Sequence, residues 1–184
     1  MNTTDTVDRT GLLVIVGVFV ALLVDGMDLQ MLALALPNIT KDLQLSPVRA
    51  GAVVKADAYG LGAERVSRTL YGEGCRHFFV AQFVEAVRLR PALAQDAQIF
   101  VLNGLQPGNE IACAEMGIVP VLNSLAQWRQ WSAAARILKR CLPAVLQFDT
   151  GMSRLGFPRE EQAELAAALR DGTNVEILFI MSHL

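Results

Sequence analysis

The sequence lacks paired cysteines and any excess of charge of one sign. It has three cysteines, Cys75, Cys113 and Cys141, and none of them belongs to a C-x-x-C pair. This spacing argues against a zinc site or a dithiol redox motif, and we expect the three thiols to be reduced and to pack as small buried hydrophobic side chains. The net charge is −2, with Lys and Arg interspersed among Asp and Glu, which argues against a nucleic-acid-binding protein.

Hydrophobic residues are the class in excess, and the excess is local. They make up 53% of the chain, against about 45–50% in ordinary globular proteins. Residues 11–24 contain no charged or strongly polar side chain, whereas charged residues recur from residue 52 onward as in a soluble protein. Two parts of different composition therefore meet near Gly51. We predict a division into residues 1–10, 11–36, 37–51 and 52–184: a polar N-terminus, a transmembrane-like helix, a loop with the junction, and a soluble domain.

Residues 11–36 have the length and composition of a membrane-spanning helix. The apolar run at 11–24 is shorter than the roughly 20 residues that span a bilayer, but residues 29–36 are again mostly apolar and Pro37 ends the segment. Two alternatives stay open, a signal peptide and a buried helix of a soluble protein. A signal peptide would have a basic start and a small-residue cleavage site, and this segment has neither.

Asp25 and Asp28 interrupt this apolar segment. They lie three residues apart, so a helix places them on one face, and carboxylates within a membrane normally face a protein interior and are functional. The sequences DGMDLQ (25–30), ALPNI (35–39) and LSPVRAG (45–51) resemble the first helix and the following loop of major facilitator superfamily transporters, most closely the aromatic-acid/proton symporters. The resemblance implies that Asp25 and Asp28 handle substrate or protons in such a helix, although one helix alone forms no transport pathway.

The orientation of this segment in a membrane stays open. Lys41 and Arg49 follow it and only Arg9 precedes it, which favours a cytoplasmic position for the residues after it. The first helix of the transporter family runs outward from the cytoplasm, which implies the opposite.

From residue 52 onward, short apolar runs alternate with amphipathic stretches. The apolar runs predict buried strands at 52–55, 78–81, 99–102, 119–122, 144–148 and 175–181. The stretches between them predict helices at 63–71, 83–89, 109–116, 125–139 and 159–169. This alternation implies a parallel sheet with helical crossovers. We predict an α/β fold, a partial (β/α)8 TIM barrel that stops two strands early and leaves the edges of its first and last strands unpaired.

Polar side chains end or follow every predicted strand, where barrels of this kind carry their functional residues. They are Lys55, Gln82, Asn103, Asn123, Asp149 and His183. A lysine desolvated at the mouth of a barrel can lose its proton and become a nucleophile or a Schiff-base partner. Lys55 is therefore the first candidate for a catalytic residue.

Three motifs around these residues resemble those of the alanine racemase family. They are AVVKADAYGLG (52–62), FDTGMSRLGF (148–157) and MSHL (181–184), in the family's order. The resemblance covers residues 52–184, the N-terminal barrel part of a racemase subunit, and implies pyridoxal 5'-phosphate as the cofactor and no metal.

The resemblance also implies a role for each matching residue. Lys55 is the position that binds the cofactor covalently and acts as one of two catalytic bases. Tyr59 matches the tyrosine that hydrogen-bonds the cofactor phosphate. Arg154 matches the arginine that contacts the phenolic oxygen of the cofactor and the substrate carboxylate, and His183 matches the histidine beside the pyridine ring.

Gln147 departs from the family pattern. Many members carry a lysine there that becomes carboxylated and pairs with the arginine equivalent to Arg154. A glutamine can donate and accept hydrogen bonds but adds no negative charge, so we expect Arg154 to be held less tightly.

The implied activity is the conversion of L-alanine to D-alanine for the cell wall, in the cytoplasm, by a homodimeric enzyme. The second base of the family is a tyrosine from the C-terminal domain of the partner subunit, and we expect that domain to be missing and the turnover of this truncated chain to be negligible. Two alternatives stay open: a transporter fragment with a foreign tail, and a pyridoxal-phosphate-binding module without turnover that residues 11–36 attach to a membrane.

Overall fold

A computed structural model describes residues 51–170 and 174–183. Within them, six strands form one parallel sheet in the order β1-β2-β3-β4-β5-β6. The strands are β1 (Gly51–Val53), β2 (His77–Val80), β3 (Gln98–Val101), β4 (Ile118–Leu122), β5 (Leu142–Asp149) and β6 (Val175–His183). Consecutive strands are neighbours throughout, as right-handed helical crossovers in a (β/α) barrel require.

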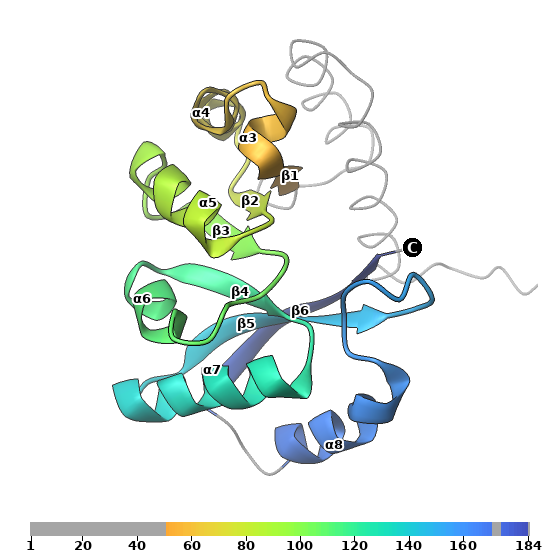
Figure 1. The fold of residues 1–184 in the computed structure, drawn as a ribbon. Coiled ribbons are helices and arrows are strands. Elements are labelled where there is room, and N and C mark those ends of the chain that lie inside the picture. The colour runs from red at the N-terminus through yellow and green to blue at the C-terminus, as the bar shows by residue number, and fades with distance from the viewer. Residues whose placement is uncertain (1–50, 171–173, 184) are drawn as a thin grey trace, which may run out of the picture.

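Helices lie along the outer side of this curved sheet (Figure 1). The longer ones are α4 (Ala63–Gly72), α5 (Phe83–Leu89), α7 (Leu125–Leu138) and α8 (Arg159–Arg170). Shorter elements are α3 (Lys55–Tyr59), the 3₁₀ helix η2 (Arg90–Ala92) and α6 (Glu110–Glu115). One or two helices lie between each strand and the next along the chain, so the described part is a half-barrel.

Two hydrophobic clusters hold this half-barrel together, one on each face of the sheet. The larger cluster lies between strands and helices and includes the fully buried Phe78, Ile99 and Trp131. The smaller one lies on the inner face. Its buried residues are Phe100, Val119, Val121 and Val145, and they pack against Phe79, Leu102, Leu178, Phe179 and Met181. Both faces of the strands are therefore apolar, as parallel sheets require.

Gly51 and Phe79 pack closely at the start of the sheet. A Cβ atom added to Gly51 would lie 2.7 Å from Phe79 Cε2, so the ring would have to move. Phe79 in turn stacks on Phe100, with ring centroids 4.7 Å apart. The glycine at which the two compositions of the sequence meet thus has a packing role in the half-barrel.

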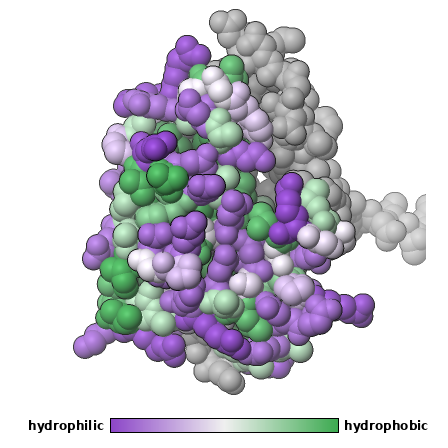
Figure 2. Space-filling model, in the orientation of Figure 1, coloured by the Kyte–Doolittle hydropathy of each residue, from purple (hydrophilic) through white to green (hydrophobic). Residues whose placement is uncertain are grey.

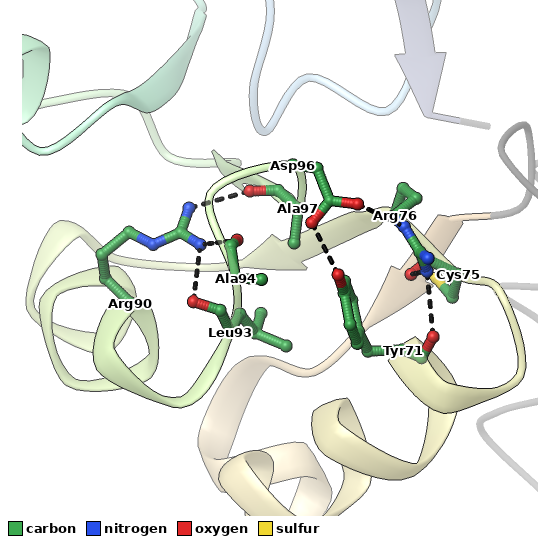
Figure 3. Close-up of polar contacts among 8 residues, drawn as sticks. All are labelled: Tyr71, Cys75, Arg76, Arg90, Leu93, Ala94, Asp96 and Ala97. Atoms are coloured by element: carbon green, nitrogen blue, oxygen red, sulfur yellow. Dashed lines mark hydrogen bonds and ion pairs between the residues drawn. The ribbon is translucent and has the colours of Figure 1, made fainter.

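A polar clamp joins the amino ends of β2 and β3 to the end of α4 (Figure 3). The Tyr71 hydroxyl donates to Asp96 Oδ1 at 2.6 Å, and Arg76 Nε donates to Asp96 Oδ2 at 2.9 Å. Arg76 also covers the Tyr71 ring, 4.0 Å from its centroid. The hydrogen bond from Tyr71 lowers the pKa of Asp96 below its ordinary value, and Arg76 acts in the same direction. Next to this clamp, buried Arg90 donates to the carbonyl oxygens of Leu93, Ala94 and Ala97.

The surface in the view of Figure 2 is mostly hydrophilic, with hydrophobic patches between the polar residues. Ile137 is 71% exposed and Ile180 is 60% exposed. Ile180 lies on β6, which within the described residues pairs only with β5. The predicted open edges at the first and last strands are confirmed for this part of the chain.

All six predicted strands and all five predicted helices are present, and every end lies within two residues of the predicted one. Three expectations need correction or fall outside the structure. β1 ends at Val53, before Lys55. Cys75 and Cys113 are buried as expected, but Cys141 is exposed.

The predicted helix at 11–36, with Asp25 and Asp28, lies outside the described residues. Within residues 51–170 and 174–183 no helix has the length and apolar character to cross a membrane.

We predict that Asp96→Asn destabilises the fold in a pH-dependent way. Because the folded-state pKa of Asp96 is lowered, its carboxylate stabilises the fold above the unfolded-state value of about 3.9, and this contribution disappears as the pH falls through the folded-state pKa. The difference in unfolding temperature between parent and variant should be present at neutral pH and vanish in acid. Glu73→Gln, which changes an exposed carboxylate outside the clamp, is the control. An equal loss for both variants, or a loss that grows in acid, would contradict the prediction.

Candidate active site at the carboxyl ends of the strands

Lys55 lies just after β1 and does not end it, as the sequence predicts it would. It is the first residue of α3 and not the last residue of β1. Val54 separates the two elements; it is 1% exposed and donates its N–H to the Phe79 carbonyl oxygen at 2.8 Å. The lysine thus extends from a short turn anchored to the sheet, at the edge where the parallel strands end.

The rest of this turn is left-handed. Ala56, Asp57 and Ala58 have φ of 52°, 54° and 53° with ψ of 46°, 45° and 49°, and Tyr59 has φ of 55°. For residues with a Cβ atom this conformation costs about 1–2 kcal/mol each. Four consecutive residues in it are a strained segment, and such strain persists only where the surrounding structure compensates for it.

Several contacts compensate for the strain. Asp57 Oδ1 accepts the N–H of Ala63 at 2.8 Å, at the start of α4, and Glu85 Oε1 accepts the N–H of Ala56 at 2.7 Å. Hydrogen bonds of this charge-assisted kind are worth about 1.5–3 kcal/mol each. Ala58 is 3% exposed within the core, and Gly60, with φ of 88°, donates its N–H to the Ala56 carbonyl oxygen at 3.1 Å. The turn is therefore tied to both helices that follow it.

Lys55 and Tyr59 are brought together by this turn. Lys55 Nζ lies 5.6 Å from the centroid of the Tyr59 ring. Lys55 is half-buried and Tyr59 is 42% exposed, so an amine and a phenol hydroxyl are accessible on one side of the turn.

Arg154 lies in the loop between β5 and α8, whose conformation Asp149 determines. Asp149 Oδ1 accepts the N–H groups of Gly151 at 2.9 Å and Ser153 at 3.0 Å, and these bonds lower the pKa of Asp149. The loop closes where Phe157 donates its N–H to the Gln147 carbonyl oxygen at 2.7 Å. Arg154 itself is exposed.

Gly156 is required for this closure. Its φ is 109°, and an added Cβ would lie 2.6 Å from the backbone nitrogen of Asp149 and from the backbone carbonyl carbon of Phe148. Neither backbone atom can rotate away as the end of a side chain can.

The last predicted residue, His183, lies beside this loop at backbone level. It is the final residue of β6 and pairs with Asp149 of β5. A hydrogen bond between the hydroxyls of Thr150 and Ser182 joins the same two segments.

Two buried amide side chains follow the inner face toward the same edge. Asn123 donates through Nδ2 to the carbonyl oxygens of Leu102 and Val121, both at 2.9 Å, which leaves its buried Oδ1 with no hydrogen-bond partner in the described structure. Gln147 is 3% exposed. Val121 pairs with Val145 and Leu122 with Leu146, and the same register continued by one residue would place Asn123 opposite Gln147.

The predicted residues thus form two groups on one edge of the sheet, Lys55 with Tyr59 after β1 and Arg154 with the backbone of His183 around β5 and β6. Among the described residues, no hydrogen bond or ion pair joins the first group to Arg154. Of the remaining strand-end residues, Gln82 precedes α5, and Asn103 accepts a hydrogen bond from Gln127 Nε2 through its carbonyl oxygen at 3.1 Å. No cluster of metal-ligating side chains occurs in residues 51–170 and 174–183.

Sequence reasoning missed Glu85, Asp57 and the unpartnered Oδ1 of Asn123. Gln82 and Glu85 have the spacing of a capping box, a local signal that could have drawn attention to Glu85. Its bond to Ala56 crosses 29 residues, and no local pattern predicts a contact of that range. An amine, a phenol and a guanidinium at one edge of a barrel can together bind a small anionic molecule that carries a carbonyl group.

Comparisons with known proteins agree with this arrangement. The family model for the alanine racemase N-terminal domain matches residues 28–184. The chain is 95% identical over 140 residues to a catabolic alanine racemase of Rhizobium johnstonii, covering 76% of this chain and 37% of that protein. It is 59% identical over 136 residues to a catabolic alanine racemase of Agrobacterium fabrum, covering 74% and 35%.

A solved structure gives the same result for the fold. The crystal structure of alanine racemase from Bartonella henselae with covalently bound pyridoxal phosphate superposes with a TM-score of 0.77 at 36% identity, covering 86% of this chain and 45% of that chain. The chain therefore spans less than half the length of these relatives. The matches give no support to the transporter resemblance of residues 1–51, and the family match begins at residue 28, inside that segment. On the family match and the half-barrel together, this chain belongs to the alanine racemase N-terminal domain family.

Proposed function

We propose that this chain provides the cofactor-binding half-barrel of a pyridoxal-phosphate-dependent alanine racemase. The observation that carries the proposal is the left-handed turn after β1, which presents the Lys55 amine beside the Tyr59 ring. The match to racemases along most of the chain supports the same assignment. The proposed substrate is alanine, the proposed location is the cytoplasm, and the proposed assembly is a homodimer.

The residues at this edge suit pyridoxal phosphate chemically. An accessible amine can bond to its aldehyde, and a phenol hydroxyl and a guanidinium can hydrogen-bond its anionic oxygens. The buried, unpartnered Asn123 Oδ1 is an acceptor that a bound donor group would satisfy.

Each residue then has a defined task in the proposed mechanism. The cofactor, when bound, stabilises the negative charge that forms when an amino acid loses its α-proton. Lys55 would hold the cofactor and move that proton to and from one face of the substrate through Nζ. Tyr59 would donate a hydrogen bond from its hydroxyl to the cofactor phosphate. Arg154 would contact the phenolic oxygen of the cofactor and the substrate carboxylate, and His183 would lie beside the pyridine ring.

Gln147 and Asp149 would determine how firmly Arg154 is held. Gln147 contributes no negative charge, and the Arg154 loop is ordered by the contacts of Asp149, Gly156 and Phe157 and by the hydrogen bond between the Thr150 and Ser182 hydroxyls. We propose that the backbone of this loop, rather than an ion pair, positions Arg154. The base for the other face of the substrate would come from the partner subunit.

We predict that purified chain incubated with pyridoxal phosphate and reduced with borohydride is labelled at Lys55. The sequence holds only three lysines, Lys41, Lys55 and Lys139, so peptide mapping identifies the site without ambiguity. Lys55→Arg should abolish the label and Lys139→Arg should leave it intact. Equal labelling of Lys55 and Lys139, or labelling that survives in Lys55→Arg, would contradict the proposed function.

We predict that Gly156→Ala weakens cofactor binding through the Arg154 loop. The added Cβ would contact backbone atoms at 2.6 Å, and overpacking of this kind costs about 1–3 kcal/mol. Gly108→Ala is the matched control, because Gly108 also has a positive φ, 96°, but has no atom within 4 Å of the added Cβ. A spectrophotometric titration with pyridoxal phosphate should show weaker binding for Gly156→Ala only. The loop has no such role if the two variants bind equally well.

Membrane attachment through residues 11–36 stays a prediction that rests on the apolar run and on Asp25 and Asp28. We expect a chain anchored in this way to remain in the pellet when membranes from expressing cells are washed with alkaline carbonate. A variant that lacks residues 11–36 should move to the supernatant. Release of both chains would be evidence against attachment.

A further inference from the structure

The carboxylate of Glu85 joins three backbone N–H groups from two separate segments. Oε2 accepts from Ala81 and Gln82, both at 2.8 Å, directly before α5. Oε1 accepts from Ala56 at 2.7 Å, across 29 residues of sequence. One oxygen therefore fixes the start of a helix, and the other fixes the residue that follows Lys55.

The position of Ala56 makes the second bond important. Ala56 is the first of the four left-handed residues, and its N–H donates to Glu85 Oε1 and not to an atom of the turn. Asp57 ties the same turn to α4 from its own side chain. Glu85 is thus the contact that ties the turn to the neighbouring strand-helix unit, β2 with α5.

We propose that Glu85 is a positioning residue for Lys55. Its Oε1 bond keeps the turn left-handed, so that the lysine amine and the Tyr59 ring lie on the same side at the carboxyl edge of the sheet. This inference rests on the proposed function for the role of Lys55. The contact between Glu85 and Ala56 does not depend on that function.

The simpler alternative is that Glu85 only caps α5. The two roles use different oxygens, so variants can separate them. Glu85→Gln retains one carbonyl oxygen and turns the other group into a donor. We expect the oxygen to stay with the two N–H groups of Ala81 and Gln82, so that the bond to Ala56 is lost. Glu85→Asp keeps the charge at the start of α5, but its side chain is one methylene shorter and should no longer reach Ala56.

Glu161 offers a matched control. Its Oε2 accepts the N–H of Leu125 at 2.7 Å, across 36 residues and at the start of α7. It is the same residue type in the same kind of long-range bond, and it joins α8 to α7 instead of to the Lys55 turn.

The experiment compares Glu85→Gln, Glu85→Asp and Glu161→Gln in the full chain with two readouts. The first is hydrogen exchange of the amides of residues 56–60 without cofactor. The second is the pyridoxal phosphate concentration that gives half-maximal borohydride-trapped label on Lys55. We expect both Glu85 variants to speed exchange and to raise that concentration by about tenfold or more, as loss of one charge-assisted bond implies. Glu161→Gln should change neither, whatever its effect on the unfolding temperature, because its bond to Leu125 does not involve the Lys55 turn.

Two results would overturn the inference. One is unchanged exchange at residues 56–60 in both Glu85 variants. The other is an equal effect of Glu161→Gln, which would mean that only global stability is measured. If the parent chain takes no label on Lys55, the proposed function fails, whereas the exchange readout still decides the role of Glu85.

Discussion

The parallel pairing of β1 to β6 is the constraint on which the rest of this structure depends. Because every strand runs in the same direction, all the segments that follow the strands emerge at one edge. Apolar side chains on both faces hold the strands, the stacked Phe79 and Phe100 on the inner face and Phe78 and Ile99 among those on the outer face. The polar residues after the strands are thereby gathered at that edge. The Tyr71–Arg76–Asp96 clamp therefore lies at the amino ends of the strands. The candidate site residues lie at the opposite, carboxyl ends.

The turn that carries Lys55 has an unfavourable left-handed backbone conformation, and hydrogen bonds from side-chain carboxylates stabilise it. Its left-handed residues include no glycine before Gly60, so the conformation is imposed by contacts and not by intrinsic preference. Asp57 and Glu85 provide those contacts from opposite sides. The loop that carries Arg154 follows the same principle, since Asp149 binds its backbone and Gly156 allows its close return. In both places carboxylates that bind backbone N–H groups fix the segment that carries a candidate site residue.

Most of the fold could be predicted from sequence because its signals are local. Apolar runs such as 99–102 and 119–122 are bounded by polar residues or glycines, and the structure places β3 and β4 there within one residue. β5 and β6 run further than their apolar runs, since Asp149 and His183 continue the backbone pairing in spite of their polar side chains. The turn after β1 could not be predicted, because Ala, Asp and Tyr give no indication of positive φ. The resemblance identified Lys55 and Tyr59, but Glu85 and Asn123 act through contacts that are distant in sequence.

A left-handed turn places the Lys55 amine at the carboxyl edge of the half-barrel, and we propose that the amine binds pyridoxal phosphate there. A crystal structure of the chain grown with pyridoxal phosphate tests this claim most directly. We predict positive φ at residues 56–59 and continuous electron density from Lys55 Nζ into the cofactor, with Glu85 on the Ala56 N–H. A right-handed turn at these residues, or a cofactor bound away from Lys55, would contradict the account.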